Sequence, residues 1–177
     1  MNRSQRNRET VEPMQTLTPS SDQIRGFRDA LGRYATGVTV VTAMGQRGPV
    51  AVTANSFTAV SLSPPLVLWC PAKQSARFEA MASARHYAIH ILAADQIDLC
   101  KRFARSGDDF AGINSEQTPE GAPLLPGVLA RFDCAAHDQH DGGDHAILVA
   151  RVLRASFRDG APLLFWGGSY GDFLKHD

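Results

Sequence analysis

Segments rich in β-branched residues follow one another along this chain with only short breaks, and this order limits its fold more than any other feature. Strands are predicted over 37–43 (GVTVVTA), over 50–53 and around Val60, before a rigid break at 63–65 (SPP). Further strands are predicted over 66–70, 87–92, 128–136, 145–157 and 162–166. Strands joined by short turns pair in antiparallel fashion, whereas a doubly wound sheet needs a helix between successive strands. The sequence therefore predicts a mainly β fold, an antiparallel barrel with flanking helices.

Three stretches of the chain have the spacing of helices. In the first, apolar residues recur three or four positions apart, namely Ile24, Phe27, Leu31 and Tyr34. Ser20 or Ser21 can cap this helix, and Gly37 is expected to end it. Shorter helices are predicted over 75–84 and 95–104, and a loop over 106–127.

Length and charge narrow the class of protein. The chain has 177 residues, of which 44% are hydrophobic, and this suits one domain with a sizeable core. Its first residues are polar and lack the apolar stretch of a secretory signal, so we expect a mobile arm over 1–20 and a single domain over 21–177. The 18 basic residues balance 18 acidic ones, without the basic footprint of proteins that bind nucleic acid or membranes. The expected partner is a small molecule or another protein.

Cysteine usage bears on the compartment. Cys70, Cys100 and Cys134 are an odd number of widely spaced cysteines, which argues against a disulfide framework. We therefore expect a reducing compartment, the cytoplasm.

Familiar catalytic and nucleotide-binding motifs give little support to other enzyme classes. The sequence contains neither a G-x-G-x-x-G after a predicted strand nor a G-x-x-x-x-G-K-[ST], and so supports neither a Rossmann site nor a P-loop. Residues 167–171 (GGSYG) match the nucleophile elbow of α/β-hydrolases. However, six residues remain after this motif, too few to supply the acid and the histidine of that mechanism.

An Asp- and Gly-rich segment contains three histidines, His137, His140 and His145. Three imidazoles within nine residues can ligate zinc or iron, with Asp141 or Asp144 assisting. The other interpretation is a polar hairpin turn over 141–144, because D-G and G-G are strong turn signals. We favour the turn and assign no metal ligand.

Three short segments carry residues suited to a nucleotide ligand. Residues 53–58 (TANSFT) place small and hydroxyl side chains at the end of a strand, where a flat ligand can approach the backbone, although such stretches also form plain turns. Lys73 and Ser75 follow a buried strand at the predicted start of a helix, where they can hold a phosphate, or else serve as a solvated loop residue and a cap. His145 opens a strand after Gly143 and Asp144, and can contact a second substrate or form a polar strand end.

Taken together, these segments resemble the short-chain flavin reductase family, the split-barrel FMN-binding reductases that serve two-component monooxygenases. The resemblance runs from about Ile24 to Gly171. It rests on the order and spacing of GRYATGVTVVTA, VTANSFTAVSLSPPLVLWC, AKQSARF, YAIHILAADQIDLCKRFA, DDFAGI, GDHAILVARV and PLLFWGGSYG.

The resemblance implies a split antiparallel β-barrel, a flavin site and an activity. It implies that 53–56 meet the flavin ring, that Lys73 and Ser75 lie at the flavin phosphate, and that His145 lies near the nicotinamide, with Tyr170 at the border of that site. The implied flavin- and nucleotide-binding positions are Thr53, Ala54, Asn55, Ser56, Ser61, Lys73, Ser75 and Tyr170. The implied activity is NAD(P)H-dependent reduction of free FMN or FAD by hydride transfer to N5, which supplies a separate oxygenase with reduced flavin. A homodimer is also implied, with the flavin at the subunit interface.

Two departures from the family pattern bear on these expectations. Ser169 stands where many members have an arginine, and the choice between NADH and NADPH therefore stays open. Residues 69–71 (WCP) replace the smaller residues that are common near the flavin phosphate. The alternatives are a flavin- or haem-binding split-barrel protein without turnover, a metal-dependent enzyme built on the three histidines, and an oxidase that reduces oxygen directly.

Overall fold

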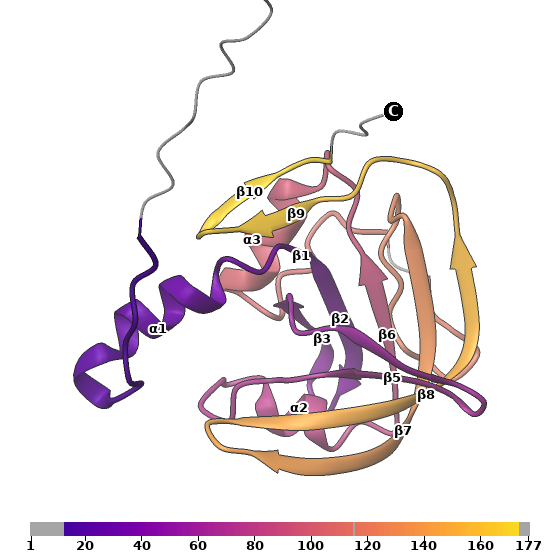
Figure 1. The fold of residues 1–177 in the computed structure, drawn as a ribbon. Coiled ribbons are helices and arrows are strands. Elements are labelled where there is room, and N and C mark those ends of the chain that lie inside the picture. Colours follow the sequence, from indigo (N-terminus) through magenta and orange to yellow (C-terminus); the bar gives the residue numbers. More distant parts are fainter. Residues whose placement is uncertain (1–12, 115, 174–177) are drawn as a thin grey trace, which may run out of the picture.

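A large antiparallel sheet forms the body of the protein in this computed structural model, which describes residues 13–114 and 116–173 (Figure 1). Its strands are β2 (Thr39–Gly45), β3 (Gly48–Ala54), β4 (Thr58–Leu62), β5 (Pro65–Trp69), β6 (His86–Ile91), β7 (Ala130–Gly142) and β8 (His145–Phe157). They lie in the order β3-β2-β6-β7-β8-β5-β4, and every neighbouring pair is antiparallel. The predicted antiparallel, mainly β fold is confirmed. Within the described residues β3 and β4 end the sheet without pairing with each other, so that it curves like a split barrel rather than closing.

Smaller elements flank this sheet. A second sheet has the order β1-β9-β10, with β1 at Thr36–Gly37, β9 at Leu164–Trp166 and β10 at Ser169–Gly171. The helices are α1 (Ile24–Leu31), preceded by one 3₁₀ turn at Ser21–Gln23, then α2 (Phe78–Ala82) and α3 (Ile97–Arg105).

Strand β2 lies at the centre of the core, because its residues are buried on both faces of the sheet. On one face Val41 packs in a cluster with Trp69 and with Met81 of α2. On the other face Val40 packs with Phe103 of α3 and with Leu163. Burial on both faces explains why this strand is a run of β-branched residues rather than an alternating pattern.

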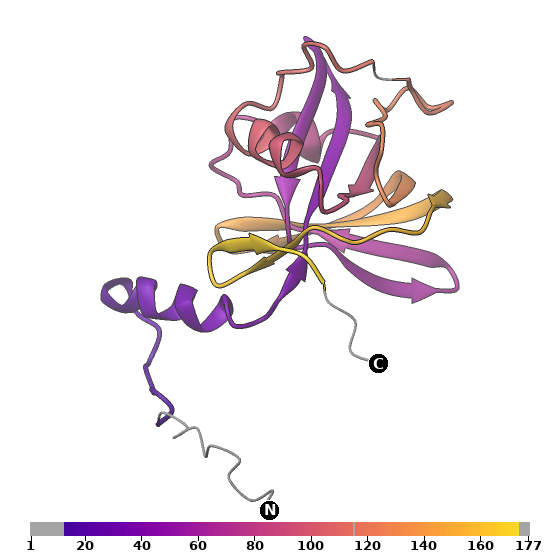
Figure 2. The same ribbon diagram turned by 90° about the horizontal axis from the view of Figure 1, so that it is seen from above.

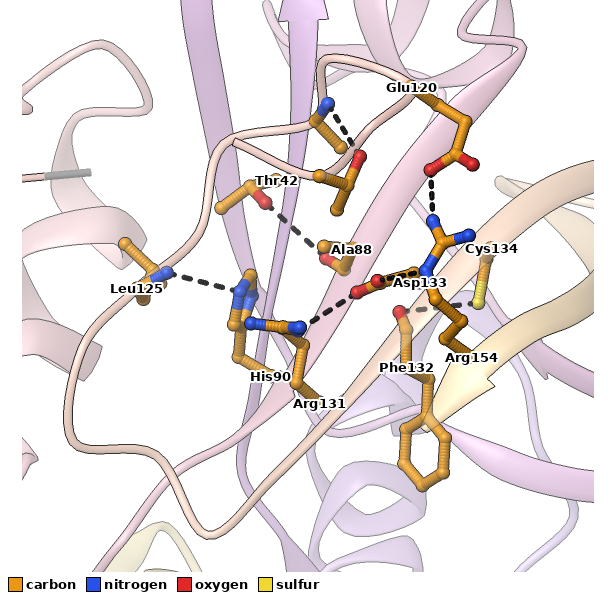
Figure 3. Close-up of polar contacts among 12 residues, drawn as sticks. Thr42, Ala88, His90, Glu120, Leu125, Arg131, Phe132, Asp133, Cys134 and Arg154 are labelled. Carbon is orange, nitrogen blue, oxygen red and sulfur yellow. Dashed lines mark hydrogen bonds and ion pairs between the residues drawn. The ribbon is translucent and has the colours of Figure 1, made fainter. Parts of the chain in front are cut away.

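A polar network built on the buried side chains of His90 and Asp133 fastens the loop after α3 to the sheet (Figure 3). His90 is fully buried, its Nδ1 lies 3.0 Å from the Val40 carbonyl oxygen, and its Nε2 accepts a hydrogen bond of 3.2 Å from the Leu125 N–H. Arg154 contacts Asp133 at 3.0 Å and also pairs with Glu120 of the loop. The loop is thereby held at both of these points.

Helix α1 projects from the body, as both views show (Figures 1 and 2). The predicted helix is confirmed, but it ends at Leu31 rather than near Gly37, because the Gly32 N–H already closes the last turn onto the Arg28 carbonyl at 2.8 Å. Its apolar residues Ile24, Phe27 and Leu31 all face solvent. An amphipathic helix with an exposed apolar face lacks the packing that usually stabilises it.

Other boundaries also differ from the prediction. Strand β7 continues past Ala136 to Gly142, and the three-residue strand β10 was not predicted. Helix α2 begins at Phe78 rather than Ser75. Of the predicted arm over 1–20, residues 1–12 lie outside the described residues, and 13–20 are largely exposed without helix or strand. None of the described helices has the length and apolar character needed to span a bilayer.

Candidate functional site

A pocket of about 230 Å³ lies between the end of β3, the segment after β5 and the start of β8. It is lined by Val52, Thr53, Ala54, Asn55, Ser56, Cys70, Pro71, Ala72, Ser75 and His145. Six of the predicted site residues thus come together from three segments that are far apart in the sequence. The small side chains of the wall, such as Ala54 and Ala72, leave room for a flat ligand close to the backbone.

The hydroxyl groups of the β3 end hold the pocket wall in place. Thr53 donates a hydrogen bond of 2.8 Å from its hydroxyl to the Cys100 carbonyl of α3. The Ser56 hydroxyl accepts a hydrogen bond of 2.9 Å from the Cys70 N–H. These bonds fasten the strand end to α3 on one side and to the segment after β5 on the other. Both side chains therefore position the backbone of 53–56 as well as lining the pocket.

Residues 71–73 run beside the start of β8 and pair with it. The Ala146 N–H donates to the Pro71 carbonyl at 3.1 Å, and the Lys73 N–H donates to the Asp144 carbonyl at 2.9 Å. This pairing holds the segment that carries Lys73 against the β7–β8 turn.

Lys73 and Ser75 precede α2 instead of lying in its first turn. The Phe78 N–H donates to the Ser75 carbonyl at 2.9 Å, which closes a turn before the helix starts. The predicted start of this helix at Ser75 is therefore wrong, because the helix is shorter and begins at Phe78. Charge at this point comes from Lys73 itself.

Lys73 follows the lining residue Ala72 and is exposed, and its ammonium group forms an ion pair with Asp141 near the end of β7. The hydrogen bond and the charge of Lys73 hold the pKa of Asp141 below its usual value. Asp141 is therefore ionised at neutral pH, and the Lys73 ammonium has an anion beside it.

His145 lies at the mouth of the pocket, and its Nδ1 is 2.8 Å from Asp144 Oδ1. Hydrogen bonding to His145 lowers the pKa of Asp144, so that this carboxylate is also ionised at neutral pH. In the neutral ring, the carboxylate favours the tautomer with its proton on Nδ1, in which Nε2 can accept a hydrogen bond.

Three predicted residues do not line this pocket, and Lys73, which directly follows the lining residue Ala72, is one of them. Ser61 lies on β4, opposite Leu66 of β5. Tyr170 lies on β10 with its ring 5.2 Å from that of Phe165. Interaction of the Tyr170 hydroxyl with the Cys100 thiol, together with burial, raises the pKa of Tyr170 to about 12. Tyr170 and Thr53 therefore interact with the same residue of α3, the first with the Cys100 thiol and the second with its carbonyl oxygen.

The histidine-rich segment forms a hairpin, as predicted. Gly142 pairs with His145, and Gly143 adopts a φ of 76°, a conformation that favours glycine in a tight turn. Among the described residues, no three His, Cys, Asp or Glu side chains lie close enough to hold a metal ion.

Four lining residues were not among the predicted site residues, although Cys70 and Pro71 had been noted as a departure from the family pattern, and the pairing of Asp141 with Lys73 and of Asp144 with His145 was not predicted. Val52, Cys70, Pro71 and Ala72 are apolar or small, and nothing in their type marks them as wall residues. The roles of Asp141 and Asp144 follow from the hairpin, which places the first beside Lys73 and the second beside His145. The only indication of these two carboxylates in the sequence was that the segment is rich in charged and turn-forming residues.

Known proteins similar to this chain have closely related names. FMN reductase (NADH) SmoA of Agrobacterium fabrum is 54% identical over 90% of this chain and 91% of its own length. The reductase subunit HsaB of a flavin-dependent monooxygenase from Rhodococcus jostii is 43% identical, over 82% of this chain and 76% of that protein.

The solved structures that resemble this chain also belong to reductases or to components of monooxygenases. The NADH:FAD oxidoreductase SgcE6 of Streptomyces globisporus, solved in complex with NAD and FAD fragments, superposes with a TM-score of 0.83 at 36% identity, over 90% of this chain and 98% of that one. Nitrilotriacetate monooxygenase component B of Mycobacterium thermoresistibile gives a TM-score of 0.82 at 39% identity, over 87% and 88% of the two chains. The model of the flavin reductase like domain matches residues 31–173. This chain belongs to the flavin reductase like domain family.

Proposed function

We propose that this protein is an NADH-dependent flavin reductase that reduces free FMN or FAD and passes the reduced flavin to a separate oxygenase. The observation that carries the proposal is the pocket that unites 53–56, Ser75 and His145 in a chain of this family. NADH is favoured over NADPH because relatives of this chain are named FMN reductase (NADH) and NADH:FAD oxidoreductase.

The residues of the pocket fit a flavin. Small side chains at Ala54, Ser56 and Ala72 allow a planar ring to lie against the backbone. Lys73 already has an anion beside it, the Asp141 carboxylate, and an ammonium group that pairs with a carboxylate can also pair with a phosphate. We assign the ring to the wall formed by 53–56 and the phosphate to Lys73 and Ser75.

The chemistry belongs to the nucleotides, and the protein supplies their orientation. When bound, the flavin supplies the N5 atom that accepts a hydride from C4 of the nicotinamide. The protein must hold the two rings with these atoms about 3–3.5 Å apart. Backbone N–H groups of 53–56 would stabilise negative charge on a ring bound against them. This division of work requires neither a catalytic triad nor a pair of catalytic carboxylates.

His145 is assigned to the nicotinamide. Asp144 orients its ring through Nδ1, which leaves Nε2 to accept a hydrogen bond from an amide such as the nicotinamide carboxamide. We assign His145 an orienting role and no proton transfer. Tyr170 is placed at the border of the same site, and Ser61 at the flavin; for both, the support is the family resemblance.

The reduced flavin must leave for a second protein, so it behaves as a substrate. Relatives of this chain are named as reductase subunits of flavin-dependent monooxygenases, and one as the reductase subunit of stachydrine N-demethylase. The partner we propose is therefore a flavin-dependent oxygenase in the same compartment, the cytoplasm. The protein itself is proposed to be a homodimer, because α1 leaves its apolar face exposed and the pocket is smaller than a whole flavin nucleotide requires.

Anaerobic oxidation of NADH with added FMN or FAD tests the proposal. We expect NADH absorbance to fall in proportion to the flavin added, and the comparison of FMN with FAD ranks the two flavins. Flavin binding without NADH oxidation would instead identify a binding protein without turnover. Activity that falls on treatment with EDTA would point to a metal-dependent enzyme. Oxidation of an organic substrate with consumption of O₂ and no second protein would indicate an oxidase.

A further inference from the structure

The turn between β7 and β8 carries a carboxylate for each of the two basic groups assigned to nucleotide binding. Asp141 pairs with Lys73, and Asp144 pairs with His145. Asp144 is adjacent to its histidine and orients it. Asp141 is different, because it lies on β7 and not beside its partner in the sequence. It forms an ion pair with the Lys73 ammonium group, to which we have assigned the flavin phosphate.

The position of Asp141 keeps it near Lys73 whatever the lysine binds. The Lys73 backbone is held to the turn by its hydrogen bond to Asp144, and Asp141 is paired with Ala146 in the hairpin register. The side chain of Asp141 is 79% exposed and that of Lys73 is 38% exposed, so the pair is solvated. Exposed ion pairs are weak, and a phosphate can displace the carboxylate at little cost.

We propose that Asp141 competes with the flavin phosphate for Lys73 and thereby lowers the affinity of the protein for phosphorylated flavins. This inference rests on the proposed function. A bound phosphate carries nearly two negative charges and would lie close to the displaced carboxylate, which repels it. Loss of the phosphate lets Asp141 pair with Lys73 again. The turn therefore favours release of a flavin that has to reach another protein.

Substitution Asp141→Asn removes the charge and retains the size of the side chain. We expect it to tighten FMN binding about three- to tenfold, because the competing ion pair and the repulsion are both lost. Riboflavin, which has no phosphate, is expected to bind the variant and the unmodified protein equally. The gain for FMN should shrink in 0.5 M salt, where charges this exposed are screened. Fluorescence titration with FMN and with riboflavin measures all of these affinities.

Two further variants locate the effect. Asp138→Asn is the matched control, since Asp138 carries the same charge on the same strand but pairs with His140 at 3.3 Å. It is expected to leave FMN affinity unchanged. In a Lys73→Ala background, Asp141→Asn is expected to have a clearly smaller effect on FMN, because the group for which the two anions compete is gone and only the screened repulsion between them remains.

Several results would overturn the inference while leaving the proposed function intact. These are an Asp141→Asn variant that binds FMN no more tightly than the unmodified protein, an equal gain for riboflavin, an equal gain from Asp138→Asn, or a gain that is undiminished without Lys73. A protein that binds neither FMN nor riboflavin would overturn the proposed function, and this inference with it.

Discussion

His145 uses one ring nitrogen to contact Asp144, and this pairing determines what the residue can do for a substrate. With Nδ1 held 2.8 Å from the carboxylate, the ring has a fixed orientation and a free acceptor at Nε2. Lys73, by contrast, offers a flexible charge that can exchange one anion for another. At the scale of single residues, the two roles in the candidate site therefore belong to different side chains. We assign orientation of the nicotinamide to His145 and attraction of the phosphate to Lys73, and one substitution removes each role.

Removal of the His145 ring tests the orienting role. We expect His145→Ala to leave flavin affinity within about twofold and to raise the KM for NADH, or slow hydride transfer, about tenfold or more, because a lost orienting contact is felt where the two rings align. Flavin titration followed by stopped-flow reduction with NADH separates these quantities. Normal NADH kinetics in a variant that binds flavin normally would contradict the role. A variant that loses both stability and flavin binding would show that His145 has a structural role. A variant that loses bound metal would show that His145 is a metal ligand.

Removal of the Lys73 charge tests the phosphate assignment. We expect Lys73→Ala to weaken FMN binding about tenfold, the lower end of the range for a charge-assisted contact, since the ammonium group is partly solvated. Riboflavin affinity is expected to stay unchanged. Lys101→Ala, which also removes an exposed lysine, is the control. Equal losses for FMN and riboflavin in parallel titrations would show that Lys73 does not contact the phosphate.

At the scale of elements, the loop after α3 depends on one buried imidazole. The neutral form of His90 with its proton on Nδ1 donates to Val40 and accepts from Leu125 at the same time, as Figure 3 shows for the Leu125 contact. A proton on Nε2 would remove that acceptor. Burial lowers the pKa of His90 to about 4, and the nearby charge of Arg131 acts in the same direction.

This lowered pKa makes the stability of the fold depend on pH. In the unfolded chain His90 binds a proton below about pH 6.5, whereas in the folded protein it resists protonation until about pH 4. Its contribution is therefore fully present above pH 6.5 and is lost as the pH falls towards 4, a change of about 3 kcal/mol. Urea unfolding of the unmodified protein and of His90→Gln between pH 4 and 7.5 measures it. Identical pH slopes for the two proteins would refute the prediction.

Elements with a strong local pattern were predictable from the sequence. Strand β8 has the predicted bounds, because a run of apolar and β-branched residues follows directly on the turn signals at 141–144. Strand β7 was cut short at Ala136, since its last residues are exposed and polar, and only pairing with β8 keeps them extended. Strand β10 has three residues, and its pairing with β9 is not visible in any local pattern.

The candidate site was predictable where its residues lie together in one short segment of the sequence. The wall at 53–56 and the positions of Ser75 and His145 followed from short segments with a recognisable composition. The carboxylate partners could not be assigned, because Asp141 and Lys73 are 68 residues apart in the sequence. The hydroxyl of Thr53 was expected to serve a ligand, whereas in the structure it also bonds to α3. Contacts of this kind depend on how separate helices and strands pack against each other, and no local sequence pattern indicates that packing.

At the scale of the whole molecule, the exposed apolar face of α1 is the feature that bears on assembly. Ile24 is 53% exposed and Leu31 is 59% exposed, on a helix that stands away from the sheets. A second copy of the chain would cover this face and would also enlarge a pocket too small for a complete flavin nucleotide. The free energy of folding and that of association would then be coupled.

Sedimentation of the flavin-loaded protein at micromolar concentration tests this assembly. We expect a homodimer, and we expect Leu31→Asp to shift it towards monomers, because a charge on the apolar face costs more when buried than when exposed. Asp29→Asn, on the same helix but outside the apolar face, should leave the dimer unchanged. A flavin-loaded monomer in the unmodified protein would contradict the prediction.

The two register shifts in the pairing of β7 with β8 constrain the number of residues in each strand. The register shifts once between Asp133 and Cys134 and again between Ala136 and Asp138, so that each strand carries one residue without a partner and both reach the turn together. Because side chains alternate along a strand, deletion of one residue between a shift and the turn would reverse the faces of all those beyond it. The hairpin end would then point its carboxylates and His145 away from the pocket with every one of those residues still present. Along this part of the chain, substitutions are expected to be tolerated far better than insertions or deletions.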